Sequence, residues 1–241
     1  MLNKIKKMYF DGGIRMKKIF EKCETLFCIL LIIFYILSNM ICIQYFGLED
    51  YRTAIINTIF SVLLIIIIIK LDRVTYYGLT KVKNIKKYFY FIPLLLIVSV
   101  NLWGGINLNN SISDITFHIL TMINIGFIEE IIFRGFLFKM MEKDNLKSAI
   151  IVTSITFGIG HIINLLNGAE LIPTIMQVGY SISIGYLFVI IFYKSKSIIP
   201  CIITHSIMNS LSIFHIEKYF YIESIFLIIV PIMYAIYINK K

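Results

Sequence analysis

Long apolar runs recur along the whole chain, and they constrain its fold more than any other feature. A bilayer core requires about 20 mostly apolar residues per helix. Runs of about this length occupy residues 25–46, 53–69, 88–107, 113–138, 148–166, 171–193, 197–215 and 219–238. The composition agrees, since 59% of the 241 residues are apolar, 15% are charged and isoleucine alone supplies 55. A soluble domain of this size could not bury so much apolar surface.

The length and uniformity of these runs decide between the two structures that span lipid. Only helices and closed barrels satisfy the backbone hydrogen bonds in a bilayer. Barrel strands alternate in polarity over about 10 residues, whereas these runs are longer and apolar throughout. We therefore predict an all-α membrane protein, a polytopic bundle of about eight transmembrane helices. Residues 1–24 are expected to form a basic segment at the membrane surface, and residues 25–241 a single transmembrane domain.

The basic residues predict how the bundle lies in the membrane. Of the 23 Lys and Arg residues, 20 fall in alternate connections and the two termini. Arg52 and Lys218 fall in the other connections, and Arg134 lies within a run. Because Lys and Arg mark cytoplasmic loops, this pattern predicts a multi-pass protein of the cell membrane with both termini in the cytoplasm. The net charge of +9 is thus explained by loops beside anionic lipid, and no nucleic-acid partner is expected.

A few ionisable residues remain inside the runs, where they are a functional hypothesis by default. Three predicted helices carry these polar side chains: Glu129, Glu130 and Arg134 on the first, His161 on the second, and His205 with Asn209 on the third. Glu130 and Arg134 are four residues apart, so they share a helical face and are expected to pair. Glu129 points about 100° away from Glu130 and needs a partner from another helix.

The expected depths of these side chains bring them to one layer of the membrane. A rise of 1.5 Å per residue from the nearest basic loop gives each depth. These depths are roughly 15 Å for Glu129, 21 Å for His161, 14 Å for His205 and 20 Å for Asn209. Since the bilayer core is about 30 Å thick, we expect all four near mid-membrane.

This set of side chains favours hydrolysis of an amide bond. A carboxylate with one histidine can polarise water, and a second histidine with Asn209 can donate hydrogen bonds to the oxyanion, each contributing about 3 kcal/mol. The same residues could hold Zn²⁺, because two histidines and a glutamate form a catalytic zinc site, so both kinds of water activation stay open. The four cysteines contain no Cys-x-x-Cys pair, and Cys201 is expected to be an apolar filler.

Three short motifs carry a family resemblance. In chain order they are Glu129-Glu130-x-x-x-Arg134-Gly135, Phe157-x-x-x-His161 and His205-x-x-x-Asn209. Together they resemble the CPBP family of intramembrane proteases, which is type II CAAX prenyl protease-like and includes bacteriocin-processing and immunity proteins, also called Abi proteins. The similarity covers about residues 113–215.

The resemblance implies a role for each residue. Glu129 and His161 would activate water, and His205 and Asn209 would stabilise the oxyanion. Glu130 and Arg134 would support the site. The family has been described both as metalloproteases and as metal-free glutamate proteases, so zinc held by Glu129, His161 and His205 stays an alternative.

We therefore expect an intramembrane endopeptidase that acts in the maturation of a bacteriocin or pheromone, or in self-immunity. Its expected partners are membrane lipid and a peptide or membrane-protein substrate. A non-catalytic immunity protein or sensor-binding scaffold would need the bundle without its chemistry, and it stays the alternative function. A transporter is disfavoured, because the sequence shows no repeat of broken helices.

Overall fold

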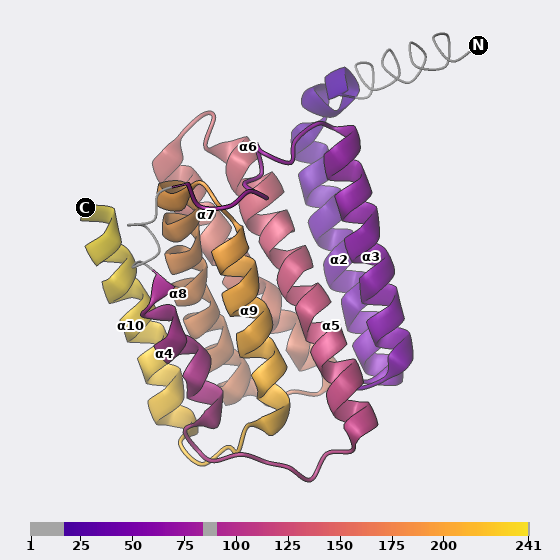
Figure 1. The fold of residues 1–241 in the computed structure, drawn as a ribbon, viewed down its shortest axis with the longest axis vertical. Helices are drawn as coiled ribbons and strands as arrows, with labels where there is room; N and C mark the ends of the chain where they lie inside the picture. The colour runs from indigo at the N-terminus through magenta and orange to yellow at the C-terminus, as the bar shows by residue number, and fades with distance from the viewer. Residues whose placement is uncertain (1–16, 84–90, 241) are drawn as a thin grey trace.

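The computed structural model describes residues 17–83 and 91–240, and these residues form helices and connections without any β-strand. Figure 1 shows them as a bundle of roughly parallel and antiparallel helices. The predicted all-α class is therefore confirmed. Residues 1–16 of the predicted basic segment lie outside the described residues.

Six helical segments in the described residues are long and apolar enough to cross a membrane. They are α2 (Glu24–Phe46), α3 (Tyr51–Lys70), α5 with its continuation (Ile112–Met141), α7 with its continuation (Leu146–Asn167), α8 (Leu171–Ser195) and α10 (Phe220–Lys240). The third and seventh predicted runs form shorter helices. These are α4 (Leu94–Ser99) with η2 (Val100–Leu102), and α9 (Ile199–Leu211) with η5 (Ser212–Phe214).

Side-chain caps explain where several helices begin. Asp50 accepts a hydrogen bond from the Arg52 backbone N–H at 2.8 Å, directly before α3. Ser111 and Asn145 do the same before α5 and α7, at 3.1 Å and 2.9 Å. Such caps satisfy backbone N–H groups that have no partner within the helix.

Two glycines allow the central helices to approach closely. α8 packs against α7 and α10, while α5 packs against α3 and α9. A Cβ atom at Gly126 of α5 would lie 2.5 Å from Ser206 Oγ of α9. A Cβ atom at Gly158 of α7 would lie 2.7 Å from the Ile182 backbone nitrogen of α8. Small residues of this kind are typical of helix contacts within membranes.

The two ends of the bundle differ in charge. The end shown uppermost in Figure 1 holds the C-terminal end of α10 and the connections around residues 71–83, 142–145 and 196–198. We call it the basic end, because it gathers most of the Lys and Arg residues. The opposite end holds the connections 47–50, 103–111, 168–170 and 215–219, with Arg52 and Lys218 beside them. The described helices thus follow the alternation of charge in the sequence.

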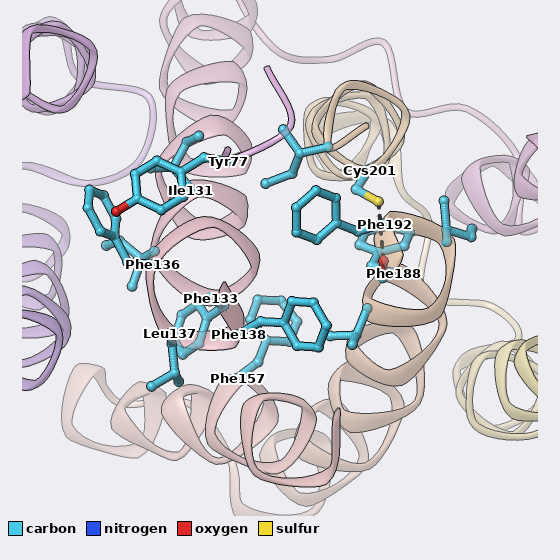
Figure 2. Close-up of a cluster of buried hydrophobic side chains, with 14 of the residues drawn as sticks. Tyr77, Ile131, Phe133, Phe136, Leu137, Phe138, Phe157, Phe188, Phe192 and Cys201 are labelled. Atoms are coloured by element: carbon cyan, nitrogen blue, oxygen red, sulfur yellow. Dashed lines mark hydrogen bonds between the residues drawn. The ribbon is translucent and has the colours of Figure 1, made fainter. Parts of the chain in front are cut away.

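An aromatic core lies around the chain segment that follows Glu129 and Glu130 (Figure 2). It is formed by Tyr77, Phe133, Phe136, Phe138, Phe157, Phe188 and Phe192, all of which are buried. Several of these residues come from η3 (Ile131–Phe138), a π-helix that continues α5 directly after Glu129 and Glu130. π-Helical turns inside α-helices occur frequently at functional sites. The π-helix η3 therefore marks the chain segment after Glu129 and Glu130 as part of a candidate functional site.

Candidate active site

A cavity of about 300 Å³ lies between α2, α5, α8, α9 and the η4 helix (Gly160–Asn167), which continues α7 (Leu146–Ile159). Glu129, His161, His205 and Asn209 all line it. The structure thus brings together the four residues that were expected to share one layer, although they come from three separate helices.

Glu129 is held by a residue from another helix. The Tyr35 hydroxyl of α2 donates a hydrogen bond to Glu129 Oε1 at 2.7 Å, and both side chains are buried. The second oxygen, Oε2, lies 3.6 Å from His205 Nε2. No side chain or backbone group in the described residues makes a hydrogen bond with Oε2. The carboxylate is therefore fixed through one oxygen and keeps the other for a further partner.

His205 connects the two carboxylates. Its Nδ1 lies 2.8 Å from Glu130 Oε1, and the same oxygen accepts a hydrogen bond from Arg134 Nη1 at 3.0 Å. Because a carboxylate paired with arginine only accepts hydrogen bonds, the Nδ1 atom of His205 carries a proton. The ring then presents Nε2 to Glu129. A continuous polar chain results, from Arg134 through Glu130 and His205 to Glu129 and Tyr35.

Arg134 is fully buried, and its partners come from three elements. Besides Glu130 it donates to the Gly185 carbonyl of α8 at 3.3 Å. Its guanidinium also lies 4.3 Å from the centre of the Phe157 ring, a favourable cation–π geometry. The predicted pairing of Glu130 with Arg134 is confirmed. Both residues have no exposed surface, whereas Glu129 reaches the cavity, so the structure separates the two adjacent carboxylates.

Phe157 lies between the two histidines. Its ring centre is 5.6 Å from that of His161 and 5.7 Å from that of His205, in perpendicular arrangements. His161 is part of η4, a 3₁₀-helix of eight residues. 3₁₀ segments longer than three or four residues are uncommon. The backbone segment that carries His161 is therefore unusual in its length.

Another histidine supports the far end of the cavity. His118 of α5 is 3% exposed. Its Nε2 donates to the Asn209 carbonyl at 3.3 Å and lies 3.1 Å from Ser212 Oγ. α9 and η5 therefore cover this side chain.

Sequence reasoning missed several polar residues of the cavity. Tyr35 and Asn39 come from α2, Asn101 from η2, and Asn164 and Gln177 from η4 and α8. Tyr35 and Asn39 are four residues apart in an apolar run, which is a signal that could have revealed a polar face on the first helix. Cys201 is fully buried, with Sγ 3.5 Å from the Phe188 carbonyl (Figure 2), which agrees with an apolar filler.

The side chains do not form a metal-binding set as they are arranged. Among the described residues, no group of three or more His, Cys, Asp or Glu side chains is placed to hold a metal ion. Glu129 Oε1 is bonded to Tyr35, and His205 Nδ1 is bonded to Glu130. Glu129 Oε2 and His205 Nε2 are left as potential ligands, but in the described residues no third His, Cys, Asp or Glu side chain is placed to complete a site with them, so this arrangement does not fit Zn²⁺.

The fold and the site define a polytopic helical membrane protein with a buried carboxylate–histidine centre. Residues 111–211 match the family model described as Rce1-like, type II CAAX prenyl endopeptidase Rce1-like. This match confirms the resemblance to CAAX protease-like proteins seen in the motifs, and all six candidate residues fall within the matched segment. No curated protein and no solved structure matches the chain significantly. At the level of the family, the match supports an intramembrane protease of the CAAX type.

Proposed function

We propose that this protein is an intramembrane endopeptidase that hydrolyses a peptide bond of a membrane-associated peptide or protein. The observation that carries the proposal is the environment of Glu129. Tyr35 fixes one oxygen of this carboxylate, and the other oxygen is buried beside His205 without a hydrogen-bond partner in the described residues, at the wall of the cavity that Glu129 lines. A carboxylate held in this way is suited to take a proton from water.

The reaction that we propose begins at Glu129 and His161. Water hydrogen-bonded between them attacks the carbonyl carbon of the substrate, and Glu129 Oε2 accepts the water proton. The new C–O bond places a negative charge on the former carbonyl oxygen. The Asn209 carboxamide and His205 Nε2, when that nitrogen is protonated, donate hydrogen bonds to this oxyanion. The C–N bond then breaks, and the proton from Glu129 goes to the leaving amine.

Glu130 and Arg134 act in this proposal by positioning His205. Glu130 fixes the Nδ1–H of the ring, and Arg134 compensates the charge of Glu130. The carboxamides of Asn39, Asn164 and Gln177 line the same cavity. A carboxamide both donates and accepts hydrogen bonds, as a peptide backbone does, so these side chains match an extended peptide substrate.

The biological role that we propose is maturation of a bacteriocin or pheromone, or self-immunity, in the cell membrane with both termini in the cytoplasm. The partners are then lipid and a peptide or membrane-protein substrate. A non-catalytic immunity protein or sensor-binding scaffold is the competing function. It requires the bundle but gives no reason for a buried carboxylate oxygen of Glu129 to stay unpaired beside a cavity.

A comparison of Glu129→Gln with Glu142→Gln tests the activity. Glu142 pairs with Lys139 near the basic end, far from the cavity, so its variant is a matched control for loss of a carboxylate. We expect peptides released from membranes, identified by mass spectrometry of their new termini, to disappear only in Glu129→Gln. Undiminished release in that variant would refute the proposed mechanism. Retained biological protection without any cleavage would favour the scaffold.

Metal dependence is tested separately. Cleavage by metal-stripped membranes in the presence of EDTA is expected to continue if Glu129 and His161 activate water without zinc. Loss of cleavage that is restored by Zn²⁺ alone would show that the side chains rearrange to bind a metal.

A further inference from the structure

Most of the segments around the cavity carry their lining residues towards the same end of the bundle. Asn39 and Ile43 of α2 (Glu24–Phe46) lie close to the connection that follows this helix, where Leu48 also lines the cavity. The lining extends to Asn164 on η4, and past α9 to Ser212 at the start of η5. These positions lie towards the opposite end of the bundle, where the chain carries few basic residues. On α8, which spans Leu171–Ser195, the lining runs across the middle of the helix, from Gln177 to Phe188.

The other direction is closed by packed side chains. Between Glu129 and the basic end lie the buried Glu130–Arg134 pair and the aromatic core of Figure 2. Phe136, Phe138 and Phe188 have no exposed surface. Protein interiors of this kind are packed as densely as organic crystals. A peptide could not reach Glu129 from the basic end without displacing several of these rings.

A second cavity of about 60 Å³ reaches the same catalytic residues. It runs between α2 and η4, where Asn39, Ile43 and Asn167 line it together with Glu129 and His161. Asn167 is next to the connection 168–170, so this cavity also extends towards the opposite end. Both cavities that Glu129 lines therefore extend towards the same end of the bundle.

We propose that the cleaved segment enters from the opposite end, and that it is an uncharged, extended peptide from that side of the membrane. This inference rests on the proposed protease function. The described cavity lining contains one carboxylate, Glu129, and no Lys or Arg. It therefore offers no Lys or Arg side chain for the free carboxylate at a peptide C-terminus, and it suits an internal peptide bond. Because basic loops mark the cytoplasmic face, the substrate approaches from outside the cytoplasm.

Chemical labelling of single cysteines tests the direction of access without requiring activity. The four natural cysteines are replaced, and Ile184→Cys or Met122→Cys places a thiol in the cavity, where both residues are buried and line the wall. Asn109→Cys marks the opposite end and Asp144→Cys the basic end, since both residues are exposed in connections. The probe is a membrane-impermeant, cationic methanethiosulfonate, applied to right-side-out and to inverted vesicles.

Both cavity thiols are expected to react at least tenfold faster in the vesicle orientation that exposes Asn109→Cys. Ile190→Cys, which is fully buried in α8 outside the cavity lining, is the control and should stay unreactive in both orientations. Faster reaction from the side of Asp144→Cys, or no reaction at either cavity thiol, would overturn the proposal. Labelling does not depend on catalysis, so it tests the direction of access alone. The Glu129→Gln experiment tests the protease function, and the failure of either proposal can be told from the failure of the other.

Discussion

Replacing Arg134 with Met should leave Glu130 as an uncompensated charge in the centre of the bundle. Both side chains have no exposed surface, and their contact is 3.0 Å long. Removing one partner of a buried ion pair costs about 3–5 kcal/mol. Met also cannot replace the hydrogen bond to the Gly185 carbonyl or the contact of the guanidinium with Phe157. We therefore expect Arg134→Met to lower the free energy of unfolding by about 3–5 kcal/mol.

A double-mutant cycle isolates the pair from these other contacts. Glu130→Gln should also destabilise the protein, because Arg134 then lacks its anion. The double variant should be more stable than the sum of the two losses predicts, since it leaves no unpaired charge. A coupling free energy of about 1.5–3 kcal/mol is expected for a hydrogen bond to a charged group. The double variant should remain inactive, because His205 has lost the carboxylate that fixes its Nδ1.

Unfolding in mixed micelles of mild detergent and dodecyl sulfate, followed by circular dichroism, measures these free energies. The matched control is Lys139→Met, which removes the partly exposed ion pair with Glu142 and should cost less than loss of the fully buried pair, because solvent screens it more. Two results would refute the reasoning that the Glu130–Arg134 pair is isolated from solvent. One is that the losses in free energy of unfolding of the two single variants add up to the loss of the double variant. The other is that Arg134→Met is as stable as the control.

Three further substitutions test the site and its packing. Tyr35→Phe removes the hydrogen bond to Glu129 and should lower kcat at least about tenfold, as expected for a bond to a charged group, whereas Tyr45→Phe, at a position 75% exposed, should leave kcat unchanged. Gly126→Val should destabilise the bundle by about 1–3 kcal/mol, because its Cβ would meet Ser206 Oγ at 2.5 Å, and a stability equal to that of the unchanged protein would contradict the close contact of α5 with α9. Gln177→Leu removes a carboxamide from the cavity and should raise KM more than it lowers kcat, so an unchanged KM would argue against peptide binding there.

The sequence predicted the helical class and singled out candidate residues that the structure places around one cavity, for reasons that are local. Apolar runs near 20 residues leave lipid-spanning helices as the structure that satisfies the backbone. The spacing of four between Glu130 and Arg134 required a shared face, and the structure confirms their contact. Glu129, His161, His205 and Asn209 were recognised because polar side chains are costly in a membrane.

Other features were not predictable from spacing along the chain. Tyr35 lies 94 residues before Glu129, and only the packing of α2 against η3 and η4 brings its hydroxyl to that carboxylate. The burial of His118 likewise depends on α9 and η5, which supply its contacts with Asn209 and Ser212. The third and seventh runs were expected to span the membrane at full length. Their described helices are shorter than the apolar runs that contain them. The apolar composition of a run does not reveal where its helix ends.

The sequence by itself determined that this protein is a helical membrane bundle with a small set of polar side chains inside its apolar runs, since helix periodicity and the cost of polar groups in lipid act residue by residue. Tertiary structure alone decided how those side chains are arranged. It buried Glu130 with Arg134, left one oxygen of Glu129 without a hydrogen-bond partner in the described residues, and packed aromatic rings beside the pair. These outcomes depend on contacts between helices that are distant in the chain, and the pattern of a single helix does not specify which neighbour it meets.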